Sequence, residues 1–117
     1  MSQIEIDELA ARLGEVVVLD VRTPQEYDGS GGQPSDPRQG HIPGARNLDV
    51  YRLLELPQSE LRDELALPDG AEIVAYCHSG SRSDLATQAL RALGYDARNY
   101  VGSWHEWSRR ADLPAEI

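Results

Sequence analysis

The sequence has very little cysteine and little basic charge. Cys77 is the single cysteine among 117 residues, which excludes an internal disulfide framework and suits a reducing compartment. The formal net charge of −9 argues against nucleic acid or an anionic membrane as a partner. No apolar run is long enough to span a membrane, and the first residues lack the basic-then-apolar order of a secretory signal. We therefore expect a cytoplasmic protein without nucleic-acid or membrane partners.

The length and the hydrophobic pattern suit one domain. A chain of 117 residues can bury a single core. Residues 16–19 and 73–76 form short apolar runs, which are typical of strands covered on both faces. Residues 85–93 carry apolar side chains at helical spacing. Because strand and helix patterns alternate, we predict one α/β domain over residues 1–117, with a mainly parallel sheet flanked by helices.

Other elements are predicted from shorter patterns. Thr23, Pro24 and Glu26 form the pattern of a capped helical turn. The further expectations are an edge strand containing Ile4 and Ile6, a helix from a cap at Asp7 to Leu13, a loop over 28–40, a strand over 46–48, helical segments broken by Pro57 and Pro68, a last strand over 96–101, and two core tryptophans, Trp104 and Trp107.

The single cysteine stands between a strand pattern and a helix pattern. Residues 77–83, Cys-His-Ser-Gly-Ser-Arg-Ser, are polar or small and lead directly into the amphipathic helix. Free N–H groups at a helix start and the cation of Arg82 favour the thiolate, and Gly80 lets the backbone turn. A structural cysteine would need none of these neighbours. Cys77 is therefore predicted to be a nucleophile.

Four sequence motifs, in order, resemble those of rhodanese-type sulfurtransferases. They are Leu19-Asp20-Val21-Arg22 with Glu26-Tyr27, Gly40-His41-Ile42-Pro43-Gly44-Ala45, Cys77-His78-Ser79-Gly80-Ser81-Arg82, and Val101-Gly102-Ser103-Trp104-His105-Glu106-Trp107. The resemblance implies a rhodanese-like three-layer fold with Cys77 as the catalytic residue. The residues that it implies for binding the substrate or the persulfide are His78, Ser79, Gly80, Ser81 and Arg82.

The resemblance also implies roles outside the cysteine loop. Residues 28–40 are longer than in many one-domain rhodaneses and look like the catalytic half of two-domain thiosulfate and mercaptopyruvate sulfurtransferases, so Arg38 is expected to reach a substrate anion at the mouth of the site. Asp20, Arg22 and Glu26 match a structural brace near the loop. His41 matches a structural corner of the fold.

The resemblance implies a transferase that moves a sulfane sulfur through a Cys77 persulfide. The donor would be thiosulfate, with mercaptopyruvate as the alternative, and the acceptor a thiol, cyanide or a protein. Arg82 would either bind the leaving anion or shape the loop. No cofactor motif is visible, and the three histidines and Cys77 have no recognised metal-ligand spacing, so no metal site is expected.

Other functions stay open at the level of sequence. Cys77 and Arg82 are separated by four residues, one fewer than in cysteine phosphatases, and the shorter loop would enclose a single sulfur atom more readily than a phosphoryl group. A cysteine-dependent phosphatase or arsenate reductase is thus the less favoured enzyme. A sulfur carrier loaded by a partner protein, or a binding module with the rhodanese shape, are the non-catalytic alternatives.

Overall fold

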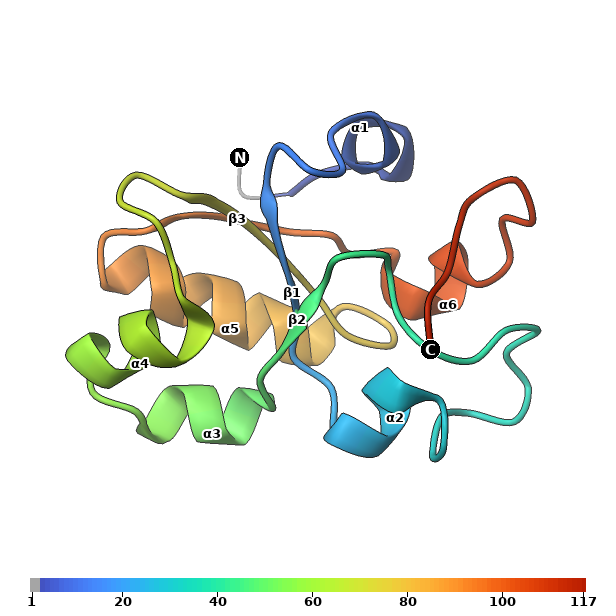
Figure 1. Ribbon diagram of the computed structural model, residues 1–117, viewed down its shortest axis with the longest axis horizontal. Helices are drawn as coiled ribbons and strands as arrows, with labels where there is room; N and C mark the ends of the chain where they lie inside the picture. Colours follow the sequence, from blue (N-terminus) through green and yellow to red (C-terminus); the bar gives the residue numbers. More distant parts are fainter. Residues whose placement is uncertain (1–2) are drawn as a thin grey trace.

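A four-stranded parallel sheet lies at the centre of the molecule. The structure is a computed structural model that describes residues 3–117. The strands are β1 (Val17–Asp20), β2 (Arg46–Asn47), β3 (Glu72–Tyr76) and β4 (Asp96–Asn99), and they pair in the order β2-β1-β3-β4 (Figure 1). Because every pairing is parallel, the carboxyl ends of the strands meet at one edge, where sites gather in sheets of this kind.

Helices cover both faces of the sheet. They are α1 (Ile6–Ala11), α2 (Pro24–Asp28), α3 (Val50–Glu55), α4 (Gln58–Leu65), α5 (Ser81–Ala92) and α6 (Ser103–Trp107). In Figure 1, α3, α4 and α5 lie below the strands and α1 lies above them. Within residues 3–117, no helix is both long and apolar enough to cross a membrane. The α/β fold with a parallel sheet between helices is therefore confirmed.

Two hydrophobic cores result from the alternation of side chains along the strands. Ile73 and Ala75 of β3 point to one face and pack with buried residues of α3, α4 and α5. Val74 and Tyr76 point to the other face and pack with α1 and α6. A central strand buried on both faces reads as a continuous apolar run, which explains why β3 was recognisable from sequence.

The amino-terminal prediction was partly wrong. Ile6 belongs to the first turn of α1, whose N-cap is Glu5, so Asp7 lies inside the helix and does not cap it. Only a short remnant of the expected edge strand exists, where Gln3 bridges to Asn99 and the amide of Ile4 donates to the Asn99 carbonyl at 3.1 Å. Packing decides between the two patterns, since Ile6 and Leu9 enter the core from the same helical face.

Two further boundaries differ from the prediction. The final strand, β4, ends at Asn99 and not at residue 101, because Tyr100 leads into a turn before α6. α5 begins at Ser81, so Arg82 lies in the first helical turn and not in the preceding loop. The two tryptophans are buried as expected, with exposed fractions of 1% for Trp104 and 0% for Trp107.

Candidate active site

Cys77 follows β3 at the carboxyl edge of the sheet, and the chain around it is tightly held. The amide of Cys77 donates to Ser103 Oγ at 3.1 Å, and its carbonyl accepts from the amide of Trp104 at 2.9 Å. Ser103 has a φ of 56°, uncommon for a residue other than glycine, and its hydroxyl also donates to the Tyr100 carbonyl. α6 therefore fixes the start of the active-site loop, residues 77–82, whose last two residues already form the start of α5.

Three hydrogen bonds converge on the Cys77 sulfur. Sγ accepts from the amide of Gly80 at 3.1 Å and from the amide and the hydroxyl of Ser83 at 3.4 Å each. Burial disfavours the thiolate, but the donors from Ser83, Gly80 and Ser79 outweigh it, so the pKa of Cys77 is lowered from its ordinary value. The site can hold negative charge on sulfur at the start of a helix.

Ser83 was missed as a site residue from the sequence. It is fully buried, with an exposed fraction of 0%. A helical side chain leans toward the amino-terminal end of its helix, which carries the Ser83 hydroxyl back over the loop. A small polar residue in the first turn of α5 was the available signal, but its distance from Cys77 could not be inferred from the sequence.

Gly80 is required by the geometry of the loop. Its φ is +99°, and a Cβ there would lie 2.7 Å from the carbonyl oxygen of Val101. The carbonyl of Gly80 in turn accepts from Asn99 Nδ2 at 3.1 Å. The end of β4 and the turn that follows it thus form the wall against which the loop is folded.

Arg82 pairs with Glu26 across the site. Arg82 Nη1 and Nη2 donate to the two carboxylate oxygens of Glu26 at 2.9 and 3.1 Å. Glu26 also closes the predicted capping box with Thr23. Burial would raise the pKa of Glu26, but the hydrogen bonds from Arg82 and Thr23 lower it to about 2. The guanidinium is therefore committed to α2, which favours a loop-shaping role over anion binding.

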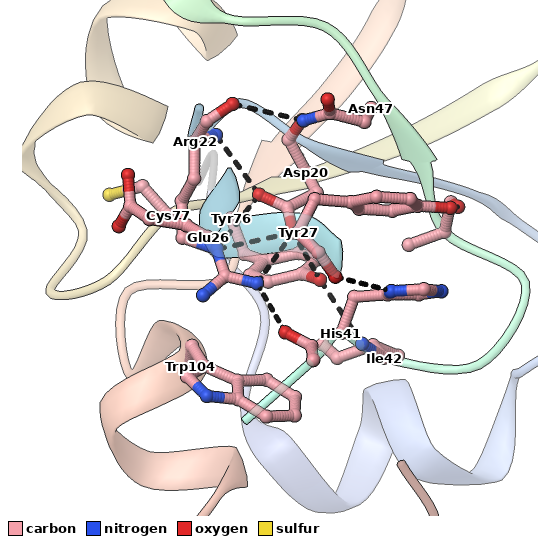
Figure 2. Close-up of polar contacts among 12 residues, drawn as sticks. Asp20, Arg22, Glu26, Tyr27, His41, Ile42, Asn47, Tyr76, Cys77 and Trp104 are labelled. Atoms are coloured by element: carbon pink, nitrogen blue, oxygen red, sulfur yellow. Dashed lines mark hydrogen bonds and ion pairs between the residues drawn. The ribbon is translucent and has the colours of Figure 1, made fainter. Parts of the chain in front are cut away.

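Asp20 and Arg22 form a buried ion pair beneath the loop. Arg22 Nη2 donates to Asp20 Oδ2 at 2.8 Å and to the Gly40 carbonyl at 2.6 Å, while Tyr76 Oη donates to the same carboxylate at 2.8 Å. The Arg22 guanidinium also lies over the ring of Trp104, 5.2 Å from its centroid. Figure 2 shows these side chains converging between the strand ends and α6. Such contacts are those of a structural brace.

Arg38 points toward the carboxyl-terminal segment. Its guanidinium donates to four backbone carbonyls, those of Trp107, Ser108, Arg110 and Leu113. These contacts do not favour the expected reach to a substrate anion, because the guanidinium would first have to leave them. The resemblance of the 28–40 loop implied that Arg38 reaches the mouth of the site, but these acceptors could not be predicted from the sequence.

His41 lies in a packed corner. Its ring stacks on Tyr27 with centroids 3.7 Å apart, and Nδ1 lies 2.8 Å from the Tyr27 carbonyl oxygen (Figure 2). The side chain is nearly buried. The contacts fit the structural corner that the sequence suggested for this residue.

His78 contacts a residue for which the sequence predicted no role. Its Nε2 lies 2.9 Å from Oδ2 of the buried Asp36, which comes from the 28–40 loop. The imidazole also meets His105 of α6 edge to face. The spacing along the chain predicted no metal site, yet the potential ligand atoms of Asp36, His78 and His105 all lie within 4.8 Å of one another.

Comparisons with known proteins agree with this geometry. A profile of the rhodanese-like domain matches residues 5–110. A thiosulfate sulfurtransferase of Azotobacter vinelandii is 36% identical over 95% of this chain and 44% of that protein. The sulfur carrier protein TtuD of Thermus thermophilus is 35% identical over 86% of this chain and 41% of its own length.

A solved structure described as a probable thiosulfate sulfurtransferase superposes on 99% of this chain with a TM-score of 0.85 and 41% identity, covering 48% of that chain. This chain thus spans less than half the length of the curated relatives that it matches. The match over residues 5–110 and the identity to these relatives show that the chain belongs to the rhodanese-like domain family.

Proposed function

We propose that this domain transfers a sulfane sulfur from a small-molecule donor to an acceptor through a persulfide on Cys77. The observation that carries the proposal is the set of hydrogen bonds from Gly80 and Ser83 to Cys77 Sγ at the start of α5. Donors that stabilise a thiolate there also suit the terminal sulfur of a persulfide. Relatives named thiosulfate sulfurtransferase support thiosulfate as the donor.

The reaction takes place in two displacements. The Cys77 thiolate attacks the outer sulfur of thiosulfate, a new S–S bond forms, and sulfite leaves with the electron pair of the broken bond. A thiol or cyanide then attacks the outer sulfur of the persulfide and restores the thiolate. Splitting the transfer in this way needs no cofactor, since the cysteine carries the sulfur between the two steps.

The loop residues divide the work in this mechanism. The amides of Ser79, Gly80 and Ser83 stabilise charge on sulfur, while Arg82 holds the loop through Glu26. His78 and Ser81 complete the rim of the loop as binding residues. Mercaptopyruvate is the alternative donor, with the enolate of pyruvate as its leaving group. A reducing cytoplasmic location stays a prediction from the single cysteine.

A persulfide carrier loaded by a partner protein is the second candidate. It is favoured by the relative named as a sulfur carrier, which shares 35% identity with this chain. Both candidates require Cys77, but a carrier would react poorly with free thiosulfate. A binding module without chemistry would not require the three hydrogen bonds to Cys77 Sγ. A phosphatase would require a loop wide enough for a phosphoryl group.

Intact-protein mass spectrometry after incubation with thiosulfate tests the proposal. We expect one added sulfur atom on the wild type, with release of sulfite, and no addition on Cys77→Ser. The same experiment with mercaptopyruvate distinguishes the donors. A folded wild type that gains no sulfur from either donor would contradict the proposed sulfurtransferase activity. Loading of Cys77 by a persulfidated protein would then support the sulfur carrier.

A further inference from the structure

Three potential metal ligands from separate parts of the chain converge beside the active-site loop. Asp36 comes from the 28–40 loop, His78 follows Cys77, and His105 lies on α6. One carboxylate oxygen and two imidazole nitrogens all lie within 4.8 Å of one another. The brace and the sulfur chemistry described above use neither Asp36 nor His105.

Asp36 is the fixed member of this group. Its side chain is 1% exposed, and its two oxygens face different partners. Oδ1 accepts from Arg109 Nη1 at 2.9 Å, and Oδ2 lies 2.9 Å from His78 Nε2. Carboxylates that ligate metals are commonly held in this way, with one oxygen engaged by an outer donor. The direction of Oδ2 is therefore set before any ion arrives.

The main chain holds the two imidazoles near each other. The amide of His105 donates to the His78 carbonyl at 3.0 Å, and Arg109 Nη1 donates to the His105 carbonyl at 2.7 Å. The rings meet at 83° with centroids 5.6 Å apart. His78 is partly exposed and His105 is exposed, so the group opens to solvent on its imidazole side.

We propose that Asp36, His78 and His105 bind a divalent first-row transition metal ion, with Zn²⁺ as the best match. Two imidazole nitrogens and one carboxylate oxygen form the kind of donor set that open zinc sites use, and a fourth position is left for water or another ligand. The ion displaces the hydrogen shared by His78 and Asp36, and the two ligand atoms, 2.9 Å apart in this structure, separate slightly to admit it. Mg²⁺ and Ca²⁺ are disfavoured because they prefer oxygen ligands.

Arg109 sets the character of the site. Its positive charge, 2.9 Å from Asp36 Oδ1, repels an incoming cation while its hydrogen bond orients the carboxylate. We therefore expect Zn²⁺ to bind more weakly here than in a closed structural zinc site. Cys77 is not in the ligand group found among residues 3–117, and His78 is the one residue that the group shares with the rim of the active-site loop.

The test uses the full chain, free of any affinity tag, with Cys77→Ser so that the thiol supplies no ligand. Calorimetric titration with Zn²⁺ is expected to show one saturable site. Replacing the exposed His105 by alanine in this background removes a direct ligand, so the affinity falls by at least about tenfold. Asp112→Asn is the matched control, because it removes an exposed carboxylate that pairs with Arg110 outside the group. That variant should bind Zn²⁺ like its parent.

A second readout reports the ligands directly. Co²⁺ bound in place of Zn²⁺ should give the strong visible absorption of a low-coordinate site, and Asp36→Asn should abolish it while circular dichroism confirms the fold. Equal Zn²⁺ affinity of the parent and the His105→Ala variant would overturn the proposal. So would a titration of the folded parent that shows no saturable binding.

Discussion

At the scale of single residues, the charge on Cys77 depends on very close donors. The net charge of the chain is −9, so long-range electrostatics oppose a thiolate and cannot be its cause. Gly80 and Ser83 supply the three hydrogen bonds to Sγ, and two of them come from backbone amides, which an alanine substitution leaves in place. The hydroxyl of Ser83 is the one donor of the three that an alanine substitution deletes.

Ser83→Ala should therefore make Cys77 less reactive. Removal of the hydroxyl moves the pKa of Cys77 back toward its ordinary value, because a donor to the thiolate is lost. We expect alkylation by iodoacetamide at neutral pH to slow by about tenfold, the equivalent of one hydrogen bond of about 1.4 kcal/mol. The measurement is the alkylation rate as a function of pH.

The pH profile gives this prediction a direction. In the wild type the thiolate persists below the pH at which the denatured chain loses it, and in Ser83→Ala the midpoint of the profile should rise. Ser81→Ala is the control, since Ser81 is exposed and is not among the donors to Sγ in the described residues. Identical profiles for Ser83→Ala and the wild type would show that the backbone amides alone stabilise the thiolate.

Residues of the site differ in how far sequence could reveal them. Cys77 was recognisable because a lone cysteine ended a buried strand and preceded a helix. Ser103 and Asn99 were not, because they act on residues 26 and 19 positions away through turns that only the folded chain brings together. Asp36 was not recognised because it lies in a loop whose Gly and Pro content predicted irregular structure. That content does not indicate which residues the loop contacts.

At the scale of elements, the site depends on how α2 meets α5. Local chemistry fixes α2, since Thr23 and Glu26 cap it reciprocally, and this was predicted from sequence alone. The pairing of Glu26 with Arg82 of α5 was not, because sequence patterns do not show which helices face each other. The same carboxylate thus caps the start of α2 and anchors the first turn of α5.

Glu26→Gln should weaken this contact in a pH-dependent way. The pKa of Glu26 is about 2 in the folded protein and near 4.5 ordinarily, so its stabilisation is complete above about pH 4.5 and is lost as the pH falls toward 2. At neutral pH we expect the variant to lose about 1 to 3 kcal/mol in the free energy of unfolding, as for a hydrogen bond to a charged group. Urea unfolding at several pH values measures the difference.

Glu64→Gln provides the comparison for this variant. Glu64 pairs with Arg52 at 2.9 Å, but both side chains are exposed, so its removal should cost no more than about 1 kcal/mol. If the gap between wild type and Glu26→Gln stayed constant from neutral to acid pH, the pair would not be the source of stability. Equal losses in the two variants would likewise argue against a special role for the Glu26–Arg82 contact.

At the scale of the whole molecule, the 28–41 segment is joined to the carboxyl-terminal segment. His41 and Glu116 exchange backbone hydrogen bonds of 2.7 and 2.9 Å, and Trp104 Nε1 donates to the Arg38 carbonyl at 3.0 Å. The four carbonyls bound by the Arg38 guanidinium complete the junction. These contacts cover the hydrophobic core that contains Trp104 and Trp107 of α6. α6 is also the helix whose residues hydrogen-bond to the backbone of Cys77.

Arg38→Ala should consequently lower the stability of the fold more than it weakens the binding of thiosulfate. Loss of a charged donor to four carbonyls is expected to cost about 2 to 4 kcal/mol in the free energy of unfolding, with carbonyls that reach water recovering part of their hydrogen bonding. Arg38→Lys should recover only part of this loss, because an ammonium group lacks the planar fork that spans separate acceptors. Arg52→Ala, at an exposed ion pair, should change stability by about 1 kcal/mol or less.

Steady-state kinetics of the same variants separate the two roles considered for Arg38. If Arg38 is structural, the midpoint of thermal unfolding falls, while the KM for thiosulfate of the remaining folded enzyme stays close to that of the wild type. If the KM rises several-fold in a variant of unchanged stability, Arg38 binds the donor anion, as the family resemblance implied, and the four carbonyl contacts must break when the donor enters. The geometry favours the first result, since the guanidinium is already engaged by the carboxyl-terminal segment.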